Sequence, residues 1–172
     1  MTTRKTDAEN IKNLYETIDE QNLSDEEKYK YLTQNDSDIL EHKARVLKII
    51  GERGLGALMN DTKWLRLQKV ISKLEYPPAY LEKRVTDTEF IYSDVDTDTI
   101  SFIGDWSPYY MEGMPLFFDI EYLIIIPRRK EYLGTLVKAM TVDISEQLKD
   151  ILIKNKIPFE MDHANFVIFG YK

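Results

Sequence analysis

Two acidic side chains, Asp119 and Glu121, lie within the most apolar stretch of the chain, residues 101–127. Side chains alternate across a strand, so residues two apart share a face and lie about 7 Å apart. A carboxylate pair beside aromatic residues can perform acid and base chemistry or hold a hard cation such as Mg²⁺. With Asp105 and Glu112 from the preceding loop, this pair is one hypothesis for the site of a metal-assisted hydrolase.

A structural interpretation of Asp119 and Glu121 competes with the catalytic one. The two carboxylates could face solvent or pair with Arg128 and Arg129 across a sheet edge, and structural networks also perturb acids. The chain has no cysteine and two histidines, without the serine arrangement that nucleophilic catalysis needs. The sequence therefore leans against an enzyme and predicts no cofactor.

A second acidic pattern, Asp94, Asp96 and Asp98, has the spacing of a calcium-binding loop. Such a loop also needs a glycine where Thr99 stands and a bidentate glutamate where Asp105 stands. Aspartate is also common in turns. We therefore interpret the pattern as a solvated turn, with these aspartates only weak candidates for a divalent cation, and predict no metal site.

Charge is distributed unevenly along the chain. The net charge is −7, and the window from Asp87 to Glu121 holds nine acidic residues and neither lysine nor arginine. Such a window disfavours nucleic acid and anionic membranes and favours a basic protein partner. Its aromatic residues could anchor a partner, although burial over the sheet is the alternative for Trp106. The candidate partner-binding residues are Asp105, Trp106, Tyr109, Tyr110, Glu112, Asp119 and Glu121.

The stretch that would position Asp119 and Glu121 reads as a strand over residues 116–126. It is rich in β-branched and aromatic residues and lies between Pro115 and Pro127. Its second half is apolar on both faces, which is typical of a central strand. The sequence therefore predicts that this strand organises the sheet.

The rest of the chain predicts an α+β fold. Its antiparallel-dominated sheet should have about five to six strands, packed with helices. A helical N-terminal extension at 1–56 should precede the α+β domain at 57–172. The expected helices lie at 7–20, after Ser24 with Glu27 as a capping box, from Ser37 or Asp38 to the glycines at 51–56, after Asn60, and after Asp143. The other expected strands lie near 80–86, 88–93, 99–104, 159–162 and 165–171, with 127–141 partly irregular and the last two strands joined at His163-Ala164.

The composition bounds the compartment and the size of the core. With 172 residues, 43% of them hydrophobic, the chain is long enough for a substantial core. The lack of cysteine fits a reducing compartment. The first ten residues lack the apolar core of a signal peptide, and no apolar run reaches membrane-spanning length. We therefore expect a cytoplasmic protein.

Several short stretches carry a resemblance to known sequences. They are MNDTKW at 59–64, GDW at 104–106 with IEY at 120–122, DIS at 143–145, IP at 157–158, and FVIFGY at 166–171. In these the chain from Met59 to Lys172 resembles a family of short uncharacterised bacterial proteins, with residues 1–58 outside as an extension. The resemblance implies a bacterial source and a shared fold, and it supplies no catalytic residue.

The leading interpretation is a non-enzymatic protein-binding module with an acidic, aromatic surface. An immunity or antitoxin-like role would fit, because carboxylates and aromatic anchors suit the surface of a basic nuclease toxin. This interpretation fails if the nine acids are dispersed over the fold or paired internally. The hydrolase is the alternative, and a homo-oligomer formed through the N-terminal helices is a third hypothesis.

Overall fold

The chain divides into two compact units, residues 1–47 and 48–172. A computed structural model describes residues 16, 18, 22–90 and 95–172, and the helix expected at 7–20 lies almost wholly outside them. The division falls before the glycine-rich stretch 51–56, where the sequence predicts a boundary.

Helix α2 (Asp25–Asn35) begins with the predicted capping box. The Ser24 hydroxyl accepts from the Glu27 amide, and the Glu27 carboxylate accepts from the Ser24 amide at 2.9 Å. Helix α3 (Ser37–Arg53) follows, but its cap is Asp36 instead of the expected Ser37 or Asp38. The Asp36 carboxylate accepts from the amides of residues 38 and 39, so the signal lies one residue earlier than predicted.

The main sheet is antiparallel, with strand order β1-β2-β6-β5. Its strands are β1 (Ala79–Arg84), β2 (Ile120–Ile126), β5 (Glu160–Asp162) and β6 (Asn165–Phe169). Strand β2 lies inside the sheet as predicted, with Leu123 and Ile125 fully buried. The β5–β6 hairpin turns at His163 and Ala164 as expected, and both have the positive φ of a tight hairpin turn. The α+β prediction is confirmed.

Two strands expected near 88–93 and 99–104 are wrong for the residues described there. Residues 88–90 and 95–104 form no strand, while 91–94 lie outside the described part of the chain. Phe90, Val95 and Ile100 instead pack against the β-sheet residues Leu81 and Ile126. The apolar side chains cover one face of the sheet from an irregular segment, so their hydrophobicity reflects burial and not strand pairing.

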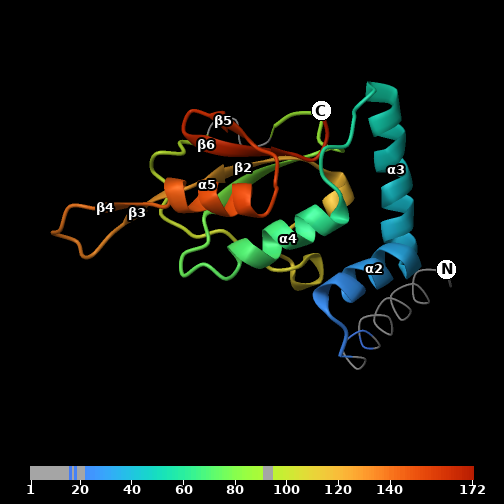
Figure 1. Ribbon diagram of the computed structural model, residues 1–172, viewed down its shortest axis with the longest axis horizontal. Coiled ribbons are helices and arrows are strands. Elements are labelled where there is room, and N and C mark those ends of the chain that lie inside the picture. The colour runs from blue at the N-terminus through green and yellow to red at the C-terminus, as the bar shows by residue number, and fades with distance from the viewer. Residues whose placement is uncertain (1–15, 17, 19–21, 91–94) are drawn as a thin grey trace, which may run out of the picture. The chain divides into compact units, whose positions relative to one another are not determined.

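The region around Pro127 also differs from the prediction. The strand begins only at Ile120, because Phe117–Asp119 form a short 3₁₀ turn, η2. After Pro127, β3 (Arg128–Glu131) and β4 (Met140–Asp143) pair in a hairpin where an irregular connection was expected. This hairpin extends away from the four-stranded sheet (Figure 1).

Two helices complete the second unit. Helix α4 (Asp61–Ile71) is capped by Asn60, one of the residues expected there, and buries Trp64, whose ring stacks on Phe117 at 6.2 Å. Helix α5 (Ser145–Lys154) buries two leucines. Both helices lie in front of the sheet in Figure 1. None of the helices in the described ranges is long and apolar enough to cross a membrane.

Candidate functional site

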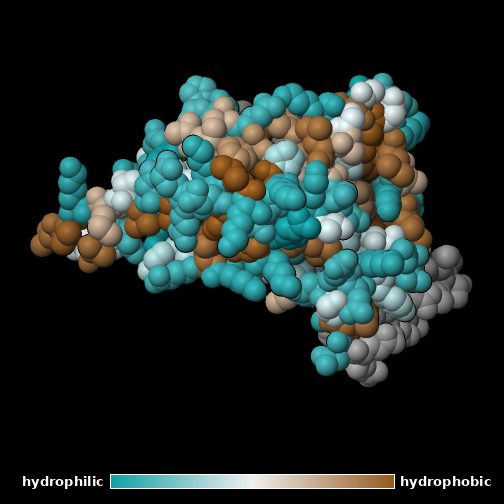
Figure 2. Space-filling view, viewed as in Figure 1, coloured by the Kyte–Doolittle hydropathy of each residue, from teal (hydrophilic) through white to brown (hydrophobic). Residues whose placement is uncertain are grey.

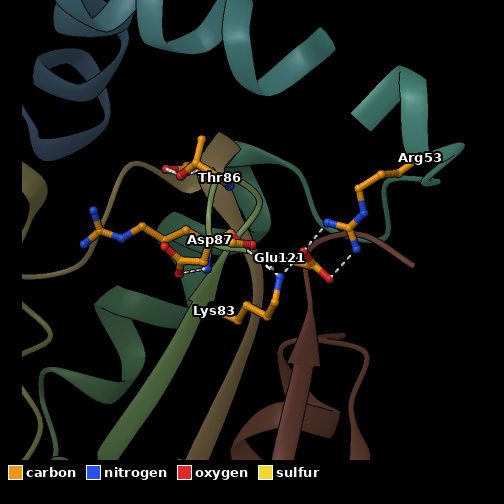
Figure 3. Close-up of polar contacts among 7 residues, drawn as sticks. Arg53, Lys83, Thr86, Asp87 and Glu121 are labelled. Carbon is orange, nitrogen blue, oxygen red and sulfur yellow. Dashed lines mark hydrogen bonds and ion pairs between the residues drawn. The ribbon is translucent and has the colours of Figure 1, made fainter. Parts of the chain in front are cut away.

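Glu121, at the start of β2, is held by two cationic side chains from distant parts of the second unit. Arg53 binds it with two parallel hydrogen bonds, Nη1 to Oε2 at 2.6 Å and Nη2 to Oε1 at 2.9 Å. Lys83 donates from Nζ to Oε2 at 2.8 Å. Figure 3 shows the arginine and the lysine converging on the one carboxylate. Each carboxylate oxygen therefore has at least one charged donor.

The backbone places these side chains. Lys83 lies on β1, which pairs with β2, and the register shifts at Lys83 and Arg84. The Glu121 carbonyl accepts from the amides of Gly170 and Tyr171, at 2.8 and 3.2 Å. A side chain at Gly170 would place its Cβ 2.0 Å from the Ile120 carbonyl oxygen, so this close approach requires glycine. The end of the chain thus fixes the strand that carries Glu121.

The electrostatics of this site favour a permanent charge pair. The side chains of Glu121 and Lys83 are only 11% and 12% exposed. Burial raises the pKa of Glu121, but the hydrogen bonds from Arg53 and Lys83 lower the pKa by more than burial raises it. The net shift of the pKa is therefore downward. The hydrogen bond to Glu121 raises the pKa of Arg53. An ionised carboxylate whose two oxygens are both engaged is poorly placed to act as a base or metal ligand.

Asp119 has a separate role from Glu121. It ends the η2 turn instead of sharing a strand face, and it is 2% exposed. Its carboxylate accepts from the hydroxyl and amide of Thr86, at 3.2 and 3.3 Å. Its carbonyl accepts from the Val85 amide at 2.7 Å. Asp119 therefore fastens the chain just after β1, and the sequence missed Thr86 because nothing in its local pattern marks a partner.

Trp106 anchors the loop that precedes η2. It is 2% exposed, and its Nε1 donates to the Pro78 carbonyl at 2.8 Å. Tyr80 packs edge-on against its ring and donates to the carbonyl of Asp105. The Asp105 carboxylate accepts from the hydroxyl and then the amide of Ser107, which lower its pKa. Trp106 is therefore buried, which was the alternative to an exposed partner anchor.

Other side chains of this loop remain exposed. Tyr109 and Glu112 are exposed as a partner-binding surface requires, whereas Tyr110 is half-buried. The sequence analysis missed three further exposed apolar residues, Phe102, Ile103 and Met111, the first two of which it placed in a strand near 99–104. We call the following set the exposed loop: Phe102, Ile103, Asp105, Tyr109, Met111 and Glu112.

Comparison with protein families identifies the domain but not its activity. Residues 46–172 match a family of unknown function, DUF6678. The chain belongs to this family. The match begins before Met59, where the sequence resemblance starts, so it also includes Arg53 of the Glu121 site. Comparisons with curated proteins and with solved structures found no match.

The four carboxylates of the hydrolase hypothesis differ in exposure in this DUF6678 domain: Asp119 and Glu121 are buried, and Asp105 and Glu112 are exposed. Among the residues that the structure describes, no group of three His, Asp or Glu side chains is placed to hold a metal ion. Asp96 accepts from the Asp98 amide as in a turn, Asp98 lies 3.7 Å from Arg128, and Asp94 lies outside the described residues. The alternative in which Glu121 pairs with Arg128 and Arg129 is wrong, because the basic residues that reach it come from α3 and β1.

Proposed function

We propose that this DUF6678 chain is a non-catalytic protein-binding module whose exposed loop docks on a basic surface of a partner protein. The observation that carries the proposal is the composition of that loop. It combines exposed apolar side chains with Asp105 and Glu112, in a window without lysine or arginine. Apolar anchors slow release, and fixed carboxylates speed the approach of a basic partner.

The anchoring of the loop supports this proposal. Besides the Trp106 hydrogen bond, the Gly104 amide donates to the Pro77 carbonyl at 3.0 Å. The Met114 amide donates to the Ser107 carbonyl at 2.8 Å. A loop tied down at several points loses little conformational entropy on binding, which favours affinity. An immunity or antitoxin-like protein, which masks a basic toxin, is the functional class that we infer.

The two buried acids support a binding role over hydrolysis. Glu121 and Asp119 are engaged by Arg53, Lys83 and Thr86, so neither presents a free oxygen pair to a substrate. Only Asp105 and Glu112 of the four hydrolase candidates are exposed. The surface that we propose is therefore smaller than the sequence implies, because Trp106, Asp119 and Glu121 drop out of it.

The test is a quantitative binding measurement with matched variants. The tagged chain is cross-linked in its native cells, a captured basic protein is purified, and its affinity is measured by biolayer interferometry. Replacing Tyr109 and Met111 together by serine should weaken binding at least roughly tenfold, as expected for hot-spot anchors. Glu112→Gln should lower the association rate and its dependence on salt.

A control separates the exposed loop from acidity in general. Glu146→Gln removes an exposed carboxylate from α5 and should leave both rate constants unchanged. Equal binding by the wild type and the Tyr109/Met111 variant would overturn the proposal. So would a partner whose binding surface is acidic.

A further inference from the structure

The β3–β4 hairpin ends in a concentration of exposed apolar side chains. The strand pairing ends at Glu131 and Met140, and the chain between them forms the connection. We define the hairpin tip as the exposed apolar residues Tyr132, Leu133, Leu136, Val137 and Met140. Leu136 is 100% exposed. Figure 2 shows hydrophobic surface at the far end of this hairpin.

The base of the hairpin is tied to the sheet. Arg128 donates to the Ala164 carbonyl at 2.7 Å and to the Asn165 side chain at 3.1 Å. The Lys130 amide donates to the Ile100 carbonyl at 2.7 Å, and Arg129 lies over the Tyr76 ring. These contacts hold the strands while leaving the tip in solvent. The exposed apolar side chains of the hairpin tip therefore lie on a hairpin whose base is held by hydrogen bonds.

The charges near the tip are basic, in contrast to the exposed loop. Residues 128–143 contain four basic and two acidic residues, and residues 132–137 contain neither. Glu131 is paired with Arg129 at 3.3 Å. Lys130 precedes the hairpin tip, and the exposed Lys138 lies within the connection, between Val137 and Met140. Exposed apolar side chains with lysines beside them are a combination that suits a lipid interface.

We propose that the hairpin tip inserts shallowly into the interface of a phospholipid bilayer that carries anionic headgroups. Tyr132 and the aliphatic side chains enter the boundary between headgroups and acyl chains, and Lys130 and Lys138 contact the anionic headgroups. A fluid bilayer accepts a projecting apolar end without a groove of matching shape. The connection needs no internal backbone pairing there, because headgroups and water reach it at this depth.

This proposal departs from the expectation of no membrane partner. That expectation rests on the acidic window 87–121, which the hairpin does not share. Anionic lipids repel the acidic window and attract the lysines of the hairpin. This charge asymmetry orients the hairpin toward the membrane surface. The interaction is independent of the proposed protein-binding loop, and either can fail without the other.

The experiment is co-sedimentation of the full chain with vesicles. One set contains phosphatidylcholine mixed with phosphatidylserine, and the other contains phosphatidylcholine alone. The chain should bind the anionic vesicles, and Leu133→Ser with Leu136→Ser should weaken this binding at least roughly tenfold. Lys130→Gln with Lys138→Gln should remove the preference for phosphatidylserine while leaving the weaker binding to phosphatidylcholine.

Two further measurements make the result decisive. Phe102→Ser with Ile103→Ser removes comparable apolar surface from the exposed loop and should not affect vesicle binding. Tyr132→Trp should show a blue shift of fluorescence with anionic vesicles, as its indole leaves water. If the chain bound neither kind of vesicle, the proposal would be overturned. It would also be overturned if the Phe102/Ile103 control lost as much vesicle binding as the Leu133/Leu136 variant. Tip-dependent self-association in light scattering without vesicle binding would assign the surface to a second copy and also overturn it.

Discussion

Two parts of the acidic window, Glu121 and the exposed loop, use the same residue types in opposite ways. At one end Glu121 is buried, charged and held by Arg53 and Lys83. Earlier in the window Asp105 and Glu112 lie on the exposed loop, and the Asp105 carboxylate accepts hydrogen bonds from Ser107, two residues away. What separates a structural acid from an available one is whether a hydrogen-bond donor from a distant segment reaches it, as Arg53 and Lys83 reach Glu121 and Thr86 reaches Asp119. A cluster of acids in sequence is therefore not yet an acidic surface.

The sharpest test of this difference is Glu121→Gln. The substitution keeps the shape but leaves Arg53 and Lys83 without their anion in a largely desolvated site. We expect the free energy of unfolding to fall by about 3 kcal/mol, the lower end for breaking a buried ion pair, because Arg53 is partly exposed. Urea denaturation followed by circular dichroism measures it.

Glu112→Gln is the matched control, since it makes the same chemical change at an exposed position in the same window. Its free energy of unfolding should stay within about 0.5 kcal/mol of the wild type. Equal free energies of unfolding for the two variants would mean that the ion pairs of Glu121 contribute no more to stability than a surface charge does.

Acid titration should reproduce the same contrast. The pKa of Glu121 is depressed in the folded state, so the unfolded chain binds a proton first as the pH falls. The stability from Glu121 is therefore present above its unfolded pKa, about 4.3, and is lost as the pH falls through the folded pKa. The gap in unfolding free energy between wild type and Glu121→Gln should narrow from neutral pH toward about pH 3.

Other acids with lowered pKa values do not affect the difference in unfolding free energy between wild type and Glu121→Gln. Asp105 and Asp143 also have lowered pKa values, through hydrogen bonds from Ser107 and Ser145, but both remain in the variant. Their effect cancels in the difference. A gap that stays constant down to acid pH would show that Glu121 is not the titrating group behind it.

A smaller effect is expected at the anchor of the exposed loop. Trp106→Phe removes the donor to the Pro78 carbonyl and leaves a buried acceptor without its partner. The free energy of unfolding should fall by about 2 kcal/mol, within the range for losing a buried hydrogen bond. Amide exchange at Gly104, whose N–H donates to Pro77, should also become faster.

Unchanged exchange at Gly104 despite a loss of stability would contradict the anchoring role. The indole hydrogen bond would then stabilise the core without ordering the loop. Tyr80→Phe is a useful comparison, because it removes the hydrogen bond to the Asp105 carbonyl and retains the packing of the ring against Trp106.

Local signals predicted the fold well, and long-range pairings explain what they missed. The capping box at Ser24, the interior strand β2 and the turn at His163-Ala164 depend on neighbours in sequence, so they were visible there. The partner of Glu121 on α3 is 68 residues away, and no local pattern marks it. The segment around Ile100 was mistaken for strand because an irregular chain that covers a sheet needs the same apolar residues.

The smallest effect should come from the apolar part of the exposed loop. Tyr109→Ser with Met111→Ser removes two side chains that face solvent, so the free energy of unfolding should change by less than about 0.5 kcal/mol for each. The same urea titration used for Glu121→Gln measures it, which places Glu121 and the exposed loop on one scale of unfolding free energy. If this double variant lost as much stability as Glu121→Gln, the exposed loop would be structural in the same way as Glu121. The exposed loop would then give no support to a protein partner, because the stability of the fold would already explain its apolar residues.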